Sequence, residues 1–137
     1  MKYKIFNKEV KLPQKGHLPD SGLDLFIPTD FELKPLETKT IGLGLGFAIP
    51  EGFAGMLVPR SSIAEQGLLI QTAIIDPDYT GEIHLIITNC SLNEKHITKD
   101  SRLCSLVVYS VLNPYLQEVE KFEETQRGDK GFGSTGV

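Results

Sequence analysis

The segment 41–49 constrains the fold of this chain most, because its apolar residues alternate strictly with small ones. Its sequence, IGLGLGFAI, has an apolar side chain at every second position and glycine or alanine between them. A period of two is that of a β-strand, whose successive side chains point to opposite faces. The three glycines on one face indicate that another backbone segment approaches closely. We therefore predict one strand over 41–49, packed against neighbouring backbone.

Helical periodicity is nearly absent elsewhere, and short apolar segments recur at roughly ten-residue spacing between turns such as Pro28-Thr29-Asp30. This rhythm is typical of an all-β fold, a jelly-roll-like β-sandwich or barrel. One short helix is expected over 61–66, with a serine as N-cap and Gly67 as its stop. The further expected strands cover residues 3–6, 23–27, 31–33, 53–58, 68–71, 83–88, 103–111 and 116–119.

Length and composition indicate a single domain of 137 residues, with a β core over 1–124 and an arm over 125–137. A net charge of −4 argues against a general nucleic-acid-binding protein, which would need a basic face. No segment approaches the ~20 apolar residues of a membrane span. Cys90 and Cys104 lie in strand-like segments without metal-ligand spacing. We expect two reduced core thiols in a cytoplasmic protein that binds neither nucleic acid nor membrane.

Residues 127–137 form a glycine-rich arm with an arginine at its start and one aromatic residue. Glycines such as Gly133 let backbone N–H groups approach an anion, and hydroxyls such as that of Ser134 add donors. Arg127 supplies a charged fork, and Phe132 can lie flat on a planar ring. The arm thus has the features of a lid over a nucleotide polyphosphate. An unordered terminus is the alternative, because ordering glycines costs entropy.

The sequence Arg60-Ser61-Ser62 lies where an expected strand gives way to the expected helix. Unpaired N–H groups at a helix start, two hydroxyls and a guanidinium together favour the binding of phosphate. Simple capping of the helix by a serine is the alternative.

Asp76 directly follows the apolar run Ala73-Ile74-Ile75 and begins a tight turn. A carboxylate at the mouth of an apolar pocket, near a phosphate site, could orient and deprotonate a water molecule. Tyr79, in the same turn, could stack on a sugar. Asp and Gly also suit such a turn on conformational grounds alone.

Asp24 is another acid on an expected strand, in the sequence SGLDL. Taken alone it is a weak signal, and we expect a surface aspartate. The three histidines, at positions 17, 84 and 96, are scattered and match no metal-ligand spacing.

Five segments, in this order and at this spacing, resemble the five motifs of the trimeric all-β deoxyuridine triphosphatase (dUTPase) family. The third and fifth, at their distance from the second, are the most specific. The segments are residues 21–25 (SGLDL), 59–62 (PRSS), 73–83 (AIIDPDYTGEI), 102–105 (RLCS) and 127–136 (RGDKGFGSTG).

The resemblance implies a jelly-roll homotrimer with three active sites at subunit interfaces. The arm of one subunit would close over a site formed by the other two. Such an enzyme splits dUTP into dUMP and pyrophosphate, which limits uracil incorporation into DNA, and Mg²⁺ is held mainly by the triphosphate. Asp76 would hold the attacking water, and Asp24 would reach the metal through water. Arg60, Ser61 and Ser62 would bind the phosphates.

For the nucleoside, the resemblance implies that Tyr79 lies against the deoxyribose and leaves no room for a 2′-hydroxyl. The strand backbone at residues 73–75 would read the uracil edge. In the arm, Phe132 would cover the base and Arg127 would meet the γ-phosphate.

Two positions depart from the pattern of the family. Ser105 stands where the fourth motif usually has glutamine, so one contact to the triphosphate is expected to be lost or made through water. Ala73 stands where the third motif usually has glycine, which requires that the φ angle of Ala73 stay negative.

Two other functions remain open on the sequence. A dCTP deaminase shares this fold and an Arg-Ser-Ser segment, although deamination needs an acid placed at the base. A dUTP-gated regulatory module that docks a protein partner is the alternative from another class.

Overall fold

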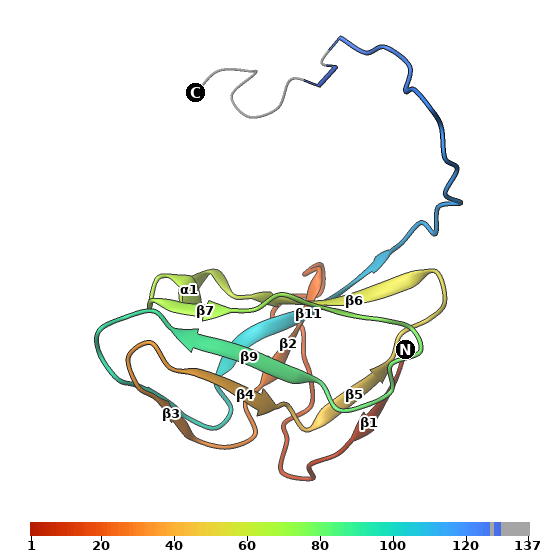
Figure 1. The fold of residues 1–137 in the computed structure, drawn as a ribbon. Coiled ribbons are helices and arrows are strands. Elements are labelled where there is room, and N and C mark those ends of the chain that lie inside the picture. The colour runs from red at the N-terminus through yellow and green to blue at the C-terminus, as the bar shows by residue number, and fades with distance from the viewer. Residues whose placement is uncertain (127, 130–137) are drawn as a thin grey trace.

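The computed structural model of the chain describes residues 1–126, 128 and 129. In that part of the chain, strands build the body and one short helix, α1 (Ser61–Ala64), lies at its edge (Figure 1). The prediction of an all-β fold with a single short helix is thus confirmed, and the sheets do not close into a barrel within the described residues.

A four-stranded antiparallel sheet carries most of the motif segments. Its strand order is β2-β11-β6-β8, so β8 is an edge strand and β11 and β6 lie in the middle. The bounds are Gly22–Phe26 for β2, Arg102–Ser110 for β11, Phe53–Pro59 for β6 and Ala73–Ile75 for β8.

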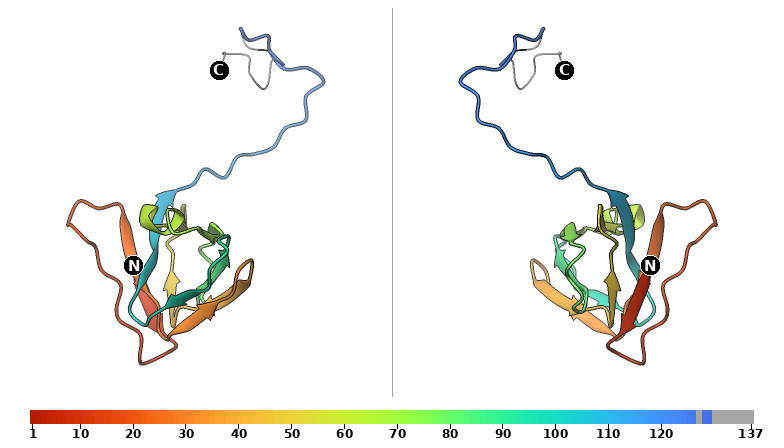
Figure 2. Two further views of the ribbon diagram at one scale, coloured as in Figure 1. Left: turned by 90° about the vertical axis from the view of Figure 1, so that its left-hand side faces the viewer. Right: turned by 90° about the vertical axis from the view of Figure 1, so that its right-hand side faces the viewer.

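The other strands form a three-stranded antiparallel sheet, in the order β4-β9-β7, and two separate pairs. Two views at right angles to the first show β2 and β11 on one side of the body and β9 on the other (Figure 2). The bounds are Thr38–Gly42 for β4, His84–Asn89 for β9 and Leu68–Ile70 for β7. The pairs are β1 (Lys2–Ile5) with β5 (Leu45–Ala48), and β3 (Phe31–Leu33) with β10 (Lys95–Ile97).

Aliphatic side chains from all of these sheets fill one core. Leu33, Leu43, Leu85 and Ile87 are completely inaccessible to solvent. Burial of such a side chain contributes about 1.5–3 kcal/mol each, so the core provides the main stabilisation of the fold. The core ends at the sheet surfaces, where the polar motif residues begin.

The alternating segment 41–49 forms two strands rather than the single strand that the sequence predicted. Gly44 adopts a φ of +72°, which ends β4 and starts β5 in a different sheet. Glycine alone takes this conformation without steric cost. The face assignment was correct, because Leu43, Leu45, Phe47 and Ile49 are all buried.

Three further expectations need correction. No strand forms at 116–119, because this segment lies outside the body and pairs with no strand among the described residues (Figure 1). The helix is shorter than expected, and Arg60 rather than a serine is its N-cap, without a capping side-chain hydrogen bond. Its stop at Gly67 is confirmed by a φ of +73°. Cys90 is exposed, so only Cys104 belongs to the core.

After β11 the chain leaves the body and extends away from it (Figure 2). The described part of this segment carries exposed apolar side chains, with Tyr115 94% and Leu116 85% accessible. None of the helices in the described residues is long and apolar enough to cross a membrane.

Candidate active site

A pocket of about 220 Å³ opens beside β8, the edge strand of the four-stranded sheet. Among the described strands β8 pairs only with β6, so the other side of its backbone is free to donate and accept hydrogen bonds. The pocket brings together the residues that the sequence placed at the base, the sugar and the water. They are Ala73, Ile74, Ile75, Asp76 and Tyr79, joined by Leu57, Glu82, Ile83 and His84.

Asp76 follows the last residue of β8 and its side chain is exposed at the pocket. The backbone N–H of Tyr79 donates to the carbonyl of Asp76 at 3.1 Å, which closes the turn. The Tyr79 hydroxyl donates to the carbonyl of Glu82 at 2.7 Å. Because these two hydrogen bonds fix the backbone and the hydroxyl of Tyr79, its ring is held at the same pocket as the Asp76 carboxylate.

Glycines fix this turn against the strands beneath it. A Cβ atom on Gly46 would lie far inside van der Waals contact with the carbonyl oxygen of Gly81. The close backbone approach that the sequence predicted therefore occurs, and the approaching segment is the turn itself. Glu82 adds a second tie, because its carboxylate accepts a hydrogen bond from the N–H of Gly44 at 2.8 Å.

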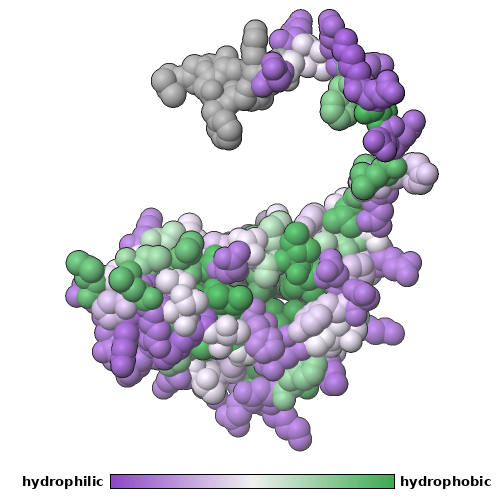
Figure 3. All heavy atoms as spheres, viewed as in Figure 1, coloured by the Kyte–Doolittle hydropathy of each residue, from purple (hydrophilic) through white to green (hydrophobic). Residues whose placement is uncertain are grey.

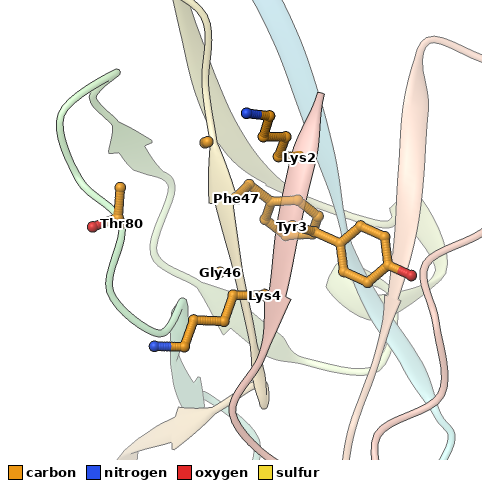
Figure 4. A pocket seen from close by; sticks show the side chains of 7 residues that line it. Lys2, Tyr3, Lys4, Gly46, Phe47 and Thr80 are labelled. Atoms are coloured by element: carbon orange, nitrogen blue, oxygen red, sulfur yellow. The ribbon is translucent and has the colours of Figure 1, made fainter.

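A second pocket, of about 200 Å³, lies between this turn and the β1–β5 pair (Figure 4). Thr80 lines it from the turn, and β1 and β5 line it from the sheet pair. In Figure 4 the Lys4 side chain extends toward the Thr80 side, whereas the Tyr3 ring points away. Asp76 and Tyr79 do not line this pocket, so the first one is the candidate for the nucleoside.

The Arg60-Ser61-Ser62 segment forms a separate corner at the end of β6. Ser61 and Ser62 are exposed in the first turn of α1. The backbone N–H of Arg60 donates to the carbonyl of Leu103 at 3.0 Å, which ties this corner to β11. Two exposed hydroxyls next to a guanidinium are suited to binding an anion.

Asp24 lies directly beneath this corner and is buried, not the surface aspartate that was expected. Its Oδ2 atom accepts hydrogen bonds from Nη1 of Arg60 and, at 3.1 Å, from Nη1 of Arg102. Its Oδ1 atom accepts from the Ser105 hydroxyl at 2.8 Å. Burial raises the pKa of Asp24, but these hydrogen bonds and the two positive charges outweigh it and lower the pKa overall. The carboxylate therefore stays ionised.

An irregularity in β11 brings Arg102 to this cluster. The pairing of β11 with β2 shifts register between Arg102 and Cys104, so that one extra residue is accommodated. Leu103 and Cys104 are consequently both buried although they are adjacent. Arg102 then joins Ser105 on the outer face, opposite Asp24. Burial, with the Asp24 charge, raises the pKa of Cys104 to about 12, so its thiol stays protonated.

Within one chain the Asp76 side of the pocket lies at the far end of β6 from the Arg60 corner, whereas its Leu57–Ala73 side reaches the middle of the strand. Ile75, the residue before Asp76, pairs with Gly55 at the start of this strand. Arg60 follows the other end of the strand, five residues further on. At about 3.3 Å per residue this separates the two by roughly 16 Å. A single chain thus does not bring Asp76 to the Arg60 corner.

Sequence reasoning did not foresee three contacts. Arg102 was known only as part of a motif and Glu82 as part of a turn, and Ser105 was expected to lose a triphosphate contact but not to bind Asp24. Their contacts link residues 78 to 81 positions apart, or 38 positions in the case of Glu82. The spacing of motifs in the sequence carries no such information. The register of β11 against β2, which pairs Ser105 with Asp24, was needed to find them.

The substitution at position 73 is compatible with a role for its backbone. Among the described residues other than glycine, only Leu36 and Asp100 have a positive φ, so Ala73 does not. The requirement that the φ angle of Ala73 stay negative is therefore met.

The residues of the arm that were predicted to bind substrate lie outside the described residues. They are Arg127, Phe132, Gly133 and Ser134. Their roles stay predictions.

The described residues hold no group of three or more His, Cys, Asp or Glu side chains able to cage a metal ion. Asp24, the predicted contact through water, already accepts hydrogen bonds on both oxygens. The protein side of the site therefore offers no dedicated metal cage in this part of the chain.

Comparison with known proteins identifies the family. The sequence model of the dUTPase family matches residues 8–136, almost the whole chain. The chain belongs to the dUTPase family. Curated dUTPases, named deoxyuridine 5′-triphosphate nucleotidohydrolases, are similar along their full length. That of Corynebacterium glutamicum is 39% identical and aligns over 95% of this chain and 90% of its own. That of Finegoldia magna is 38% identical over 99% of both chains.

Solved dUTPase structures have the same fold. The dUTPase of Staphylococcus bacteriophage 80alpha, solved with dUpNHpp, superposes with a TM-score of 0.94 at 30% identity, covering 99% of this chain and 98% of its own. The predicted family, fold and enzyme class, a dUTP diphosphatase, are thereby confirmed.

Proposed function

We propose that this chain hydrolyses dUTP to dUMP and pyrophosphate, with Asp76 orienting the water that attacks the α-phosphorus. The observation that carries the proposal is the pocket in which an unpaired strand edge, an acid and an aromatic ring meet. Family membership supports this activity over the deamination of dCTP. In-line attack by water needs little covalent help from the protein, and positioning and charge supply most of the acceleration.

The nucleoside end of the pocket fits uracil and deoxyribose. The free edge of β8 presents backbone donors and acceptors at residues 73–75, which suits the polar edge of a pyrimidine. The Tyr79 ring, fixed through Glu82, lines the same pocket, which supports a contact with the sugar that follows the base. A ring against C2′ would leave no space for a hydroxyl, so dUTP is preferred over UTP.

The phosphate end is the Arg60 corner with Ser61 and Ser62. The two guanidiniums beside the buried Asp24 give this corner a net positive charge, although the whole chain is negative. A triphosphate is attracted to such local charge through charge-assisted hydrogen bonds.

The separation of Asp76 from the Arg60 corner along β6 supports a homo-oligomer with shared sites. A nucleotide bound at the Asp76 pocket of one subunit would receive the Arg60 corner from a neighbour. A homotrimer with cyclic symmetry meets this requirement. Each subunit would contribute its Asp76 pocket to one site and its Arg60 corner to the neighbouring site.

Exposed apolar side chains give such a trimer the surface it needs. Leu69 on β7 and Ile74 on β8 are 60% and 64% accessible in the single chain. Figure 3 shows apolar side chains over the part of the body where β7 and β9 lie. Further ones, including Tyr115 and Leu116, follow β11 outside the body. Exposed surface of this kind marks contacts with another chain.

Magnesium belongs to this proposal as part of the substrate complex. Mg²⁺ retains several waters and prefers phosphate oxygens, so it needs no cage of protein carboxylates. It would shield the charge of the triphosphate. Asp24 is close to the phosphate corner and would reach the metal through a water molecule, because its Oδ1 atom has room for a second hydrogen bond beside that from Ser105.

The arm completes the proposed site from the third subunit, with Phe132 over the base and Arg127 at the γ-phosphate. Gly133 and Ser134 would add backbone and hydroxyl donors to the phosphates. Stacking by an aromatic ring is worth about 1–3 kcal/mol, which would offset part of the entropy lost on ordering the arm. Both cysteines are free thiols, which supports a cytoplasmic location.

Release of pyrophosphate from dUTP, UTP, dTTP and dCTP by the purified chain tests the activity. We expect turnover of dUTP far above that of the other three. Ammonia from dCTP, or no pyrophosphate from dUTP with magnesium present, would contradict the proposal.

A second candidate function is a nucleotide-gated docking module. The dUTPase of phage 80alpha was solved as one of the phage dUTPases that control transfer of virulence genes by a G protein-like mechanism. A catalytically silent chain that still binds a dUTP analogue tightly would favour this function for the present protein.

A further inference from the structure

We propose that Ser105 is a positioning residue that fixes the Asp24 carboxylate, which in turn holds the Arg60 and Arg102 guanidiniums toward the triphosphate. This inference rests on the proposed function of the same site. It assigns a use to the residue at which the chain departs from the glutamine that is usual in the family.

The two oxygens of Asp24 have different partners. Oδ2 receives both guanidiniums, whereas Oδ1 receives only the hydroxyl of Ser105, at 2.8 Å. The side-chain torsion of aspartate next to its carboxylate is broad and nearly two-fold, so without a partner for Oδ1 the group could turn. The serine hydroxyl therefore sets the plane of the carboxylate and the direction in which it faces the arginines.

The positive side chains of the Asp24–Arg60–Arg102 cluster lie nearer to solvent than its negative one. The Asp24 side chain is 7% accessible, whereas those of Arg60 and Arg102 are 34% and 41% accessible. One negative charge beneath two positive charges leaves a net positive surface. Guanidinium is planar and binds phosphate through paired N–H groups, so its orientation matters as much as its charge.

The fold provides space for a small residue at position 105. Ser105 lies directly across from Asp24 in the register of β11 with β2. A Cβ atom on Gly22, in the same strand β2, would lie 2.9 Å from the Cβ of Ser105. Gly22 thus leaves the room in which the serine approaches the neighbouring strand and turns its hydroxyl to the carboxylate.

With serine at position 105, a direct side-chain contact to the ligand is replaced by a hydrogen bond that fixes Asp24. A glutamine amide at position 105 would extend away from the sheet toward a ligand. The serine hydroxyl is too short for that and is already donated to Asp24. The phosphate affinity of this corner then depends on how firmly the two arginines are held.

Steady-state kinetics of Ser105→Ala on dUTP test the inference, with Ser105→Thr as the variant that keeps a hydroxyl. Ser110→Ala, at the exposed far end of the same strand, is the matched control. A hydrogen bond to a charged group typically changes an equilibrium by about ten- to 150-fold. Ser105 acts on the ligand only through Asp24 and the arginines, so we expect Ser105→Ala to raise KM for dUTP by less, about three- to tenfold.

The expected kcat changes less than about twofold, because the arginines bind the triphosphate alike in the ground and transition states. Ser105→Thr and Ser110→Ala should keep the wild-type KM. The magnesium concentration for half-maximal rate should stay unchanged in Ser105→Ala. A KM unchanged in Ser105→Ala, or a shift of the magnesium requirement in place of KM, would overturn the inference.

A double-mutant cycle with Asp24→Asn separates positioning from any independent action of the serine. In the Asp24→Asn background, Ser105→Ala should change KM by less than about twofold, because the group it positions is already altered. If Ser105→Ala raised KM in the Asp24→Asn background as much as it does in the wild type, the inference would also be overturned. Should Ser105→Ala fail to assemble, Ser105→Cys, whose S–H is a weak donor, takes its place with the same expected rise in KM.

Wild-type turnover in the same assay keeps the two proposals distinct. If the wild type hydrolyses dUTP and the variants match it, the positioning role is wrong and the proposed function stands. If the wild type releases no pyrophosphate, the proposed function itself fails.

Discussion

Asp76 and Arg60 lie at opposite ends of β6 in the same chain. Gly55, at the Asp76 end, pairs with Ile75, and Arg60 follows Pro59 at the other end. A site that uses both the acid proposed to activate water and the cation proposed to bind phosphate would therefore need two subunits.

Mixed trimers test this arrangement. We expect Asp76→Asn and Arg60→Ala to be nearly inactive as homotrimers, with Asp76→Asn losing about 10²–10⁴-fold in kcat while still binding a dUTP analogue. Co-refolding of the two variants should restore activity, because about a quarter of the sites would combine an intact acid with an intact arginine from the neighbour. Pyrophosphate release before and after mixing measures the effect. A mixture as inactive as its components would place both groups in the same subunit's site.

Removal of the arm tests the lid. A chain ending at Gln126 should assemble as the full-length protein does and lose most of its turnover, because the predicted contacts of Phe132 and Arg127 are gone. Each is worth about 1–3 kcal/mol, so we expect a loss of at least about thirtyfold in kcat/KM. Light scattering gives the assembly state of both proteins. Full activity in the shortened chain would refute the lid.

Tyr79 is expected to select the sugar through its ring rather than its hydroxyl. Tyr79→Ala should raise kcat/KM for UTP relative to dUTP by about tenfold or more, because space opens at C2′. Tyr79→Phe keeps the ring but loses the 2.7 Å hydrogen bond to Glu82, so its preference for dUTP should change little. Competition between the two nucleotides measures the ratio directly. An equal preference in the alanine variant and the wild type would exclude sugar selection by this ring.

Gly46 is expected to tolerate no side chain. In Gly46→Ala the new Cβ would collide with the carbonyl of Gly81, so backbone must move and the Asp76 turn with it. We expect a loss of about 1–3 kcal/mol in stability, typical of overpacking, together with reduced turnover. Ser110→Ala, on an exposed strand end, should change stability by less than about 0.5 kcal/mol. Thermal midpoints by circular dichroism, at one protein concentration, compare the three proteins.

The charge of Asp24 makes stability depend on pH in a defined direction. Its pKa is lowered in the folded protein by Ser105, Arg60 and Arg102, which outweigh the effect of burial. The carboxylate therefore stabilises the fold above its unfolded pKa of about 3.9, and this contribution is lost as pH falls through the folded pKa.

Comparison of the wild type with Asp24→Asn checks the sign. The difference between their thermal midpoints should be largest above about pH 5 and shrink below about pH 4. It corresponds to about 1–2 kcal/mol at neutral pH, since the arginines are partly exposed and screened. A difference that grows as the pH is lowered would contradict the depressed pKa.

Residue patterns alone predict the all-β class, the buried face of the segment 41–49 and the motif residues. The period of two at 41–49 placed Leu43, Leu45, Phe47 and Ile49 in the core, because alternation follows from backbone geometry alone. The turn at Asp76 and the family motifs are likewise local. Sequence could not decide that Gly44 divides the segment, since a glycine inside a strand pattern is compatible with either outcome.

Which distant residues meet follows from the three-dimensional fold. It buried Asp24 and joined it to Arg60, Arg102 and Ser105 from two other strands, and it separated Asp76 from Arg60. Cross-strand contacts depend on register, and a shift of one residue, such as that in β11, moves a side chain to the other face. Local preferences carry no record of register, which is fixed by packing of the whole core.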